Sequence, residues 1–399
     1  MRITAVRESG TWIATILATL TVFGPLSMDL YLPVLPALAD DLRTTASAAQ
    51  LTMTTCLLGL AFGQLLAGPL SDRFGRRVPL IVGLIVYTVS STLCAVSGDI
   101  SVLIAARLLQ GLAGGVGLVI AQASGRDLYS GAKLTRYYGR IVVLSGLAAV
   151  VAPLLGGVLA LVLDWRGFFV LLAGIGVVVT ACVALGFGET LHPAARTRGG
   201  VRDITSNLAL LMSTKQFVGA TVSSSLSSAA YFAYLAGAPF ILQNVYSLSP
   251  VPFSIVFAIN AGGFALFGFA AGRASERWGE RTIFGVGLAL LGLGACLAII
   301  AAFAVSTLTA TVAAFFFIAA GAAAVSPPST TLALTDHPRI AGTASSILGV
   351  TRFAAGAAAA PLVGLAGSND PRPTAVVAII TTALAVIAYV ALVRPRPTV

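Results

Sequence analysis

Gly68-Pro-Leu-Ser-Asp-Arg-Phe-Gly-Arg-Arg77 is one of two related stretches, and the second is Gly272-Arg-Ala-Ser-Glu-Arg-Trp-Gly-Glu-Arg281. Both carry, in the same order, a glycine, a serine, an acid, an arginine, an aromatic residue, a second glycine and a final arginine. The second stretch begins 204 residues after the first, which is close to half of the 399-residue chain. A repeat at this spacing indicates that a unit of half the chain has been duplicated.

The composition places this repeated unit in a membrane. Hydrophobic residues make up 57% of the chain and charged residues only 10%, whereas soluble domains carry about 25% charged residues. Polar breaks separate twelve apolar runs, each near or above the length of about 20 residues that a transmembrane helix needs. These runs are 12–38, 47–70, 78–98, 100–124, 134–162, 165–187, 215–242, 251–271, 282–303, 307–332, 341–366 and 373–393. We therefore predict an all-α polytopic membrane protein with two pseudo-symmetric six-helix halves.

The longest polar interruption divides the chain near its middle. It predicts an N-terminal six-helix half over 1–187, a connector over 188–214 and a C-terminal six-helix half over 215–399. If both termini are cytoplasmic, nineteen of the twenty-four Lys and Arg residues fall in inside loops and three in outside loops. Basic residues favour the cytoplasmic side, so we expect cytoplasmic termini and a cytoplasmic connector. This distribution also explains the net charge of +10 without nucleic acid as a partner.

Few residues in the predicted spans suit catalysis or metal binding. The four cysteines all lie in apolar runs, and the two histidines, His192 and His337, lie in polar connectors. This pattern does not favour a zinc site, and an embedded enzyme would need a nucleophile and base, or a metal set, at depth. The Gly-x-x-x-x-Gly-Lys-Ser/Thr loop of a primary pump is also missing from the sequence. We expect neither an enzyme nor a metal or cofactor site.

The stretch Phe23-Gly-Pro-Leu-Ser-Met-Asp-Leu-Tyr-Leu-Pro33 contains the one acid that lies well inside a predicted span. The other thirteen acids fall in loops or at helix ends. A carboxylate in hydrocarbon costs about 2.5–3.5 kcal/mol on insertion scales, and such residues are functional by default. We interpret Asp29 as a carboxyl that alternates between its protonated and ionised forms and so exchanges a proton for a substrate. The alternative is a structural carboxylate at a helix bend beside Pro25 and Pro33.

Two arginines, Arg107 and Arg352, lie inside predicted spans and are not counted with a loop, whereas Arg136, Arg140 and Arg166 lie near the starts of their spans and are counted with the adjoining loops. A guanidinium does not deprotonate in proteins, so each must find an anion, carbonyl groups or water. Arg107 is a candidate for proton coupling and substrate binding, and Gln110, one turn further on, can share its network. The alternative is an arginine that binds helix-end carbonyls and holds the bundle together. Arg352 is either a residue of the transport pathway or, if the helix boundary shifts, part of a cytoplasmic loop.

Aromatic and polar residues in other spans are candidates for the wall of a substrate cavity. They are Tyr31 in the first span, Tyr231 and Tyr234 in the seventh, and Asn260 in the eighth. Aromatic residues in membrane helices also serve in packing and in interfacial belts, so that alternative stays open for each of the tyrosines.

The charges of the two repeated loops suggest a conformational latch. Glycines permit a tight turn, and an acid near a helix end can pair with arginines. Such a cluster can hold two helices together in one conformation and release them in another. The alternative is a simple anchor of topology by positive charge. The candidate latch residues are Gly68, Asp72, Arg73, Gly75, Arg76, Arg77, Glu276 and Arg277.

The first copy of the repeat resembles the motif that joins the second and third helices in the major facilitator superfamily. Arg107-Leu-Leu-Gln-Gly111 resembles the intramembrane arginine motif of that superfamily. Ala152-Pro-Leu-Leu-Gly-Gly157 resembles the antiporter motif of its drug:proton antiporters, and Trp165-Arg166 fits their twelve-helix group. Met28-Asp-Leu-Tyr-Leu-Pro33 is similar to the bicyclomycin and chloramphenicol/florfenicol resistance subgroup. The resemblance covers nearly the whole chain.

The resemblance implies a proton-coupled multidrug efflux transporter that works by alternating access in the cytoplasmic membrane of a bacterium. It places the essential acid at Asp29 and makes the first and fourth helices neighbours. The count of basic residues then leaves Arg107 as the expected charged partner of Asp29. The residues expected to give tight packing in the fifth helix are Gly146, Pro153, Gly156 and Gly157.

The expected substrates are small amphipathic drugs such as phenicols or bicyclomycin. The other expected partners are protons and the lipid bilayer, and the expected assembly is a monomer. The alternative is a major facilitator transporter of a native metabolite, which need not be coupled to protons.

Overall fold

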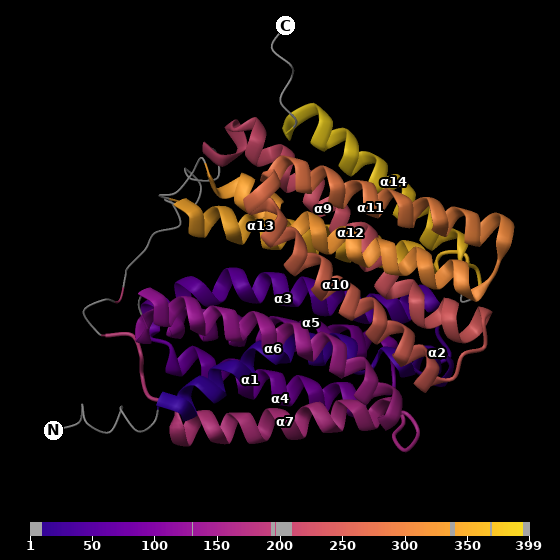
Figure 1. Ribbon diagram of the computed structural model, residues 1–399. Coiled ribbons are helices and arrows are strands. Elements are labelled where there is room, and N and C mark those ends of the chain that lie inside the picture. Colours follow the sequence, from indigo (N-terminus) through magenta and orange to yellow (C-terminus); the bar gives the residue numbers. More distant parts are fainter. Residues whose placement is uncertain are drawn as a thin grey trace, which may run out of the picture. The chain divides into compact units, whose positions relative to one another are not determined.

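The computed structural model describes residues 10–129, 131–192, 196, 210–335, 340–367 and 369–393, and this part of the chain forms helices and short connections without a β-strand (Figure 1). The helices before the connector are α1 (Gly10–Asp29), α2 (Leu35–Asp41), α3 (Ala46–Phe74), α4 (Arg77–Val96), α5 (Ile100–Leu128), α6 (Gly131–Leu159) and α7 (Trp165–Gly186). The helices after it are α9 (Lys215–Phe240), α10 (Pro250–Trp278), α11 (Glu280–Ile300), α12 (Leu308–Thr335), α13 (Ala341–Ala359) and α14 (Arg372–Ala388).

Each of the twelve predicted spans coincides with a helical segment. Eleven segments of the described chain are long and apolar enough to cross a membrane. The remaining predicted span, 134–162, corresponds to α6, which contains the shorter apolar helix Val143–Leu159. The prediction of an all-α polytopic membrane protein is therefore confirmed.

The first span differs from the prediction because it is not one continuous helix. α1 ends at Asp29, a turn follows at Leu30 and Tyr31, and a 3-10 helix, η1 (Leu32–Val34), leads into α2. Pro33 has no N–H to donate to the carbonyl of Asp29, and a proline disfavours helical geometry in the residue before it. The break therefore falls directly after the one acid at depth.

Side-chain caps fix the starts of two helices in the first half. Asp99 precedes α5 and accepts a hydrogen bond from the Ser101 N–H at 2.7 Å. Asp164 precedes α7 and accepts one from the Gly167 N–H at 2.8 Å. Each carboxylate satisfies a backbone donor that has no partner inside its helix. These two acids are thus accounted for by local structure.

The helices cluster into two compact units. Unit 1 comprises residues 1–32 and 58–199, in which α4 packs against α5 and α7, and α1 packs against α5 and α6. Unit 2 comprises residues 33–57 and 200–399, in which α12 packs against α9, α10 and α11, and α9 packs against α13 and α14. Each unit is thus a bundle in which helices that are distant in the sequence pack against one another.

Residues 33–57 belong to unit 2 although they precede the connector. The Gln50 side chain donates to the Ala236 carbonyl at 3.1 Å, and Ser47 donates to the Pro361 carbonyl at 2.9 Å. The predicted division at 1–187, 188–214 and 215–399 stays a prediction. Most of the predicted connector, 193–195 and 197–209, lies outside the described residues.

Candidate functional site

Asp29 occupies the last position of α1, where the helix is broken. It lies ten residues from one end and twelve from the other end of the apolar span Thr19–Asp41, so it is near the middle of that span. The residue is half-buried, and its carboxyl forms no hydrogen bond or ion pair with any residue in the described part of the chain. A half-buried acid without a protein partner is able to exchange a proton or contact a ligand.

Arg107 is fully buried in unit 1, where it lies on α5. Its guanidinium donates to Gln110 Oε1 and lies 3.8 Å from the sulfur of Met28. The same group stacks over the rings of Tyr31 and Phe169, at 4.6 and 5.6 Å from their centroids. A desolvated guanidinium gains about 2 kcal/mol or more from such ring contacts. Amide and aromatic groups therefore surround the charge.

Asp29 and Arg107 form no ion pair in the described part of the chain, and the role of Arg107 as the charged partner of Asp29 stays a prediction. The structure nevertheless places Arg107, Gln110 and Tyr31 together as predicted candidates of one site. Their neighbours Met28 and Phe169 were not predicted from the sequence. Met28 belongs to the motif of the first span, but neither its sulfur nor the Phe169 ring carries a charge or polar group that would have assigned it to the site.

A chain of hydrogen bonds extends this site into the core of unit 1. Gln110 Nε2 donates to Ser91 Oγ at 2.7 Å, and Ser91 Oγ donates to the Tyr87 carbonyl at 2.7 Å. The Tyr87 hydroxyl is 2.6 Å from Ser27 Oγ on α1. Because the donors and acceptors of Gln110 are both engaged, its side chain is held in one orientation for Arg107.

The predicted residues of the second half also lie together, in an aromatic cluster on α9, α10 and α12. Asn260 Nδ2 donates to the Tyr234 hydroxyl at 3.2 Å, and the Tyr234 ring packs against Phe315 with centroids 4.9 Å apart. Tyr231 packs against Tyr234 at 5.9 Å and is half-buried. Asn260 Oδ1 is buried without a hydrogen-bond partner in the described residues. An unpaired buried carbonyl is costly, so this oxygen is a candidate for a ligand contact.

Arg352 lies inside α13 and not in a loop, so the helix boundary is not shifted past it, and its role in the transport pathway stays a prediction. It is eight residues from the start of the apolar span Ala344–Gly364 and twelve from its end. Its hydrogen-bond partners are on α9 and α12. This arginine is therefore a second guanidinium at depth.

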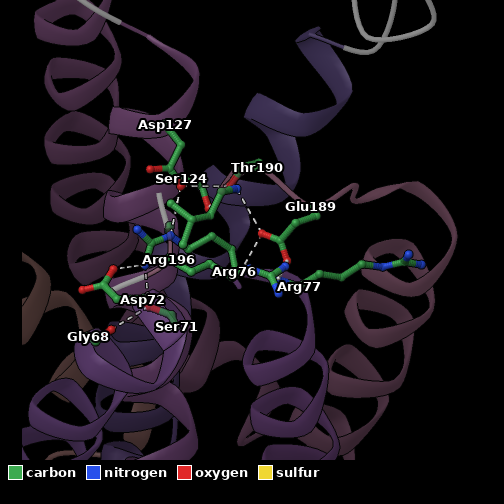
Figure 2. A network of polar contacts seen from close by, with 12 residues as sticks. Gly68, Ser71, Asp72, Arg76, Arg77, Ser124, Asp127, Glu189, Thr190 and Arg196 are labelled. Carbon is green, nitrogen blue, oxygen red and sulfur yellow. Dashed lines mark hydrogen bonds and ion pairs between the residues drawn. The ribbon is translucent and has the colours of Figure 1, made fainter. Parts of the chain in front are cut away.

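Arg76 is the centre of the polar network in the first repeated loop (Figure 2). Its guanidinium donates to Asp72 at 2.6 Å, to Ser71 at 2.7 Å and to Asp127 at 2.9 Å. Its backbone N–H donates to Glu189 at 2.8 Å. Burial opposes the charge on Arg76, but the hydrogen bonds to Asp127 and Asp72 outweigh that cost and raise the pKa of Arg76. The network joins the ends of α3, α4, α5 and α7.

Other residues of the loop lie at the margin of this network. Ser71 donates to the Gly68 carbonyl at 3.0 Å, and Arg77 donates to the Ala184 carbonyl at 2.8 Å. Arg73 is exposed and stacks over Phe74 at 5.2 Å. The sequence pattern did not assign Asp127 or Glu189 to the latch (Figure 2). Their position at the same helix ends as the arginines is the signal that could have found them.

The second copy of the loop does not form the same network. The residue that corresponds to Arg76 after 204 positions is Glu280, so the central cation is replaced by an acid. Glu276 is exposed and has no hydrogen-bond or ion-pair partner in the described chain. Arg277 stacks over Trp278 at 5.7 Å. The duplication therefore preserves the turn more closely than the charge network.

The glycine of the turn has a positive φ in both copies, 87° at Gly75 and 82° at Gly279. A side chain at Gly75 would overlap the carboxylate of Glu189, whereas one at Gly279 would meet no described atom within 4 Å. We predict that Gly75→Ala lowers the unfolding temperature in detergent more than Gly279→Ala does. Both substitutions place a side chain at a positive φ, which costs about 1–3 kcal/mol, but only Gly75→Ala also disturbs the network. Equal shifts would contradict the role of Glu189.

The fifth predicted span corresponds to α6, which contains Pro153. Pro153, Gly156 and Gly157 are buried, whereas Gly146 is half-buried and an added side chain there would meet no described atom within 4 Å. The role of this helix as an antiporter motif stays a prediction.

The fold and the charged groups at depth define a polytopic membrane protein with the architecture of a transporter. The sequence matches the family model of the Major Facilitator Superfamily over residues 12–361 and again over 222–399. The chain belongs to the major facilitator superfamily. This family consists of transporters, so the expectation that the chain is not an enzyme is confirmed.

Similar proteins indicate the subgroup of the superfamily to which the chain is related. It is 31% identical over 386 residues to the uncharacterised MFS-type transporter YdgK of Bacillus subtilis, which covers 96% of both chains. It is 28% identical over 357 residues to a bicyclomycin resistance protein homolog of Haemophilus influenzae, with 90% of both chains covered. It is 32% identical over 293 residues to a chloramphenicol resistance protein of Pseudomonas aeruginosa, which covers 72% of this chain and 69% of the relative. The subgroup resemblance predicted from the motifs is confirmed.

Solved structures support the fold. A bacterial homolog of the human lysosomal transporter Spinster, in an inward-facing and unoccupied conformation, aligns with a TM-score of 0.78 at 15% identity and covers 97% of this chain and 99% of its own. The nucleoside transporter NupG aligns with a TM-score of 0.76 at 13% identity, with 95% and 98% covered. The likeness at this identity concerns the fold, which is the major facilitator fold.

Proposed function

We propose that the protein is a proton-coupled drug exporter that works by alternating access in the bacterial cytoplasmic membrane, with both termini in the cytoplasm. The observation that carries this proposal is Asp29, the one acid inside a predicted span, at the point where α1 is broken. The names of the relatives, which include bicyclomycin and chloramphenicol resistance proteins, support drugs as the substrates.

The break gives Asp29 a chemical setting that suits a proton or another cation. The last carbonyls of a helix carry partial negative charge, and Pro33 cannot donate to the carbonyl of Asp29. Transporters often place their binding sites at such discontinuous helices near the middle of the membrane. The Asp29 carboxyl forms no hydrogen bond or ion pair with the described residues, so it is available to bind a proton or a substrate.

Arg107 supports the cycle as a fixed positive charge in unit 1. In this structure Gln110 and the rings of Tyr31 and Phe169 hold it. We propose that Arg107 approaches Asp29 in a different conformation of the cycle and favours the ionised carboxylate there. Protonation of Asp29 would then accompany its separation from Arg107, which couples the proton to the change of conformation.

Substrate contacts are proposed in both units. In unit 1 they are Asp29, Tyr31, Arg107 and Gln110, and in unit 2 they are Tyr231, Tyr234 and Asn260. The half-buried ring of Tyr231 and the unpaired oxygen of Asn260 supply the apolar surface and the single polar contact that a small amphipathic drug requires. The Arg76 network is proposed as a latch that holds α3, α4, α5 and α7 together in one conformation.

One proton supplies enough free energy for this activity. A membrane potential of about 100 mV contributes about 2.3 kcal/mol per charge, and one pH unit contributes about 1.4 kcal/mol. Together they sustain a drug gradient of roughly 500-fold for a neutral substrate. A second acid at depth is therefore not required.

The test is a drug susceptibility panel on cells that express the protein, with and without a protonophore. We expect raised resistance to phenicols or bicyclomycin-like drugs that the protonophore removes. Unchanged susceptibility across the panel, together with pH changes in vesicles caused by a native metabolite, would favour a metabolite transporter instead.

A further inference from the structure

Arg352 carries a positive charge near the middle of a span in a half of the chain that has no acid at depth. The residue lies eleven positions into α13, which is about 16 Å along the helix at 1.5 Å per residue. The acids of residues 200–399 all fall in predicted loops or at helix ends, and they are Asp203, Glu276, Glu280, Asp336 and Asp370. Their sequence positions therefore give Arg352 no counter-ion within the spans of its own half.

Neutral oxygens on two neighbouring helices hold the guanidinium instead. Nη2 donates to Ser329 Oγ at 2.8 Å, to Thr330 Oγ1 at 3.2 Å and to the Ser326 carbonyl at 3.2 Å. Nη1 donates to Ser326 Oγ at 3.2 Å, and Nε donates to Ser224 Oγ at 3.4 Å. These contacts fix the orientation of the planar group.

The hydroxyl groups are prepared to accept hydrogen bonds from Arg352. Ser224, Ser329 and Thr330 each donate their own proton to a backbone carbonyl three or four residues earlier, at distances between 2.7 and 3.2 Å. Each hydroxyl therefore turns a lone pair, and not its hydrogen, toward the guanidinium. The arrangement orients a cation but leaves its charge without a counter-ion among the residues that the structure describes.

The guanidinium also keeps a free donor. Nη1 carries two N–H groups, and the described residues supply one acceptor for it, Ser326 Oγ. The ring of Phe232 lies one turn further along the same face of α13, because it packs over Gly356, four residues after Arg352. It also packs against Phe353 with centroids 6.0 Å apart. A free N–H, an uncompensated positive charge and neighbouring rings together fit an aromatic anion.

We propose that Arg352 is the centre of an anion-binding site that takes the carboxylate or sulfonate of an aromatic, amphipathic substrate. The proposal rests on the proposed function and adds anionic compounds to the neutral drugs expected there. A bidentate anion is the group that a guanidinium binds best. A membrane potential that is negative inside drives an anion outward, so export of this class is also favoured energetically.

The test uses two probes that differ in charge but hardly in shape, 5-dimethylaminonaphthalene-1-sulfonate and its uncharged sulfonamide. Equilibrium dialysis measures their binding to the purified full-length protein in detergent. We expect the wild-type protein to prefer the sulfonate by at least about tenfold, as a charge-assisted hydrogen bond provides. Arg352→Gln is expected to remove this preference and to leave binding of the sulfonamide within about threefold of wild type.

A matched control removes an exposed arginine from the same half. Arg273→Gln changes the net charge equally at the end of α10, and its sulfonate preference is expected to equal that of the wild type. If Arg352→Gln does not fold, Arg352→Lys decides, because a lysine keeps the charge but not the planar fork, and its preference is expected to fall at least about threefold.

Several results would overturn the site. One is a wild-type protein that shows no preference for the sulfonate, and another is a variant whose preference is unchanged. A third is an Arg352→Gln variant that binds both probes more weakly by the same factor, which would indicate that Arg352 only ties helices together. Dialysis involves no proton gradient, so its outcome is independent of proton coupling. Loss of coupling would bear on the proposed function alone.

Discussion

Asp29→Asn is expected to abolish proton-driven accumulation of drug in everted membrane vesicles. Asparagine keeps nearly the same size at the end of α1 but cannot take up and release a proton at this position. The accumulation ratio should fall from a limit of roughly 500-fold, set by one proton, to about onefold. The measurement is uptake of labelled chloramphenicol after a proton pump has acidified the vesicle interior.

A matched control separates coupling from folding. Asp99→Asn makes the same chemical change at an exposed acid that caps α5, and asparagine caps helices as well as aspartate does. This control is expected to transport like the wild type, and Asp29→Glu is expected to keep part of the activity because it still titrates. Proton-driven accumulation at the wild-type level by Asp29→Asn would refute the assignment.

Arg107→Lys is expected to reduce transport at least about tenfold, although the charge is conserved. The buried guanidinium contacts Gln110 and two aromatic rings. Its charge-assisted hydrogen bond contributes about 1.5–3 kcal/mol, and its ring contacts contribute about 2 kcal/mol when desolvated. Lysine offers neither the planar fork nor the stacking surface. Transport rates in vesicles and unfolding temperatures in detergent measure the two consequences separately.

The control for this substitution is Arg166→Lys. Arg166 is half-buried and stacks over Trp165 at 4.1 Å from the ring centroid, at the start of α7. A cation and a ring at a more exposed position contribute about 0.5–1 kcal/mol, so transport is expected to change less than about threefold. A vesicle assay in which Arg107→Lys matches the wild type would exclude a specific role for the guanidinium.

Much of the architecture could be predicted because the membrane constrains each segment of the chain by its length and hydrophobicity alone. Apolar runs of spanning length must form helices in lipid, so the spans follow from counting residues between polar breaks. The two repeated loops located matching turns, and Gly75 and Gly279 both have a positive φ. The acid census isolated Asp29, since charge at depth is rare enough to be recognised without a structure.

The sequence could not predict which groups meet across helices. Phe169 and Met28 beside Arg107, and Asp127 and Glu189 beside Arg76, depend on the rotation of each helix about its own axis. A helix bend beside Pro25 and Pro33 was an alternative that the sequence left open. The length of the run 12–38 favoured one continuous span, so the break directly after Asp29 was not located. The hydroxyl groups that accept hydrogen bonds from Arg352 could not be predicted either, because they lie on two helices and converge only when those helices pack.

Release of protons on drug binding tests the central claim most directly. Chloramphenicol is added to the purified protein in weakly buffered detergent solution, and a pH-sensitive dye reports protons released at several values between about pH 5 and pH 9. We expect the wild-type protein to release up to one proton per bound drug and Asp29→Asn to release none. Equal release by both proteins, or binding to the wild type without release at any of these pH values, would contradict the claim.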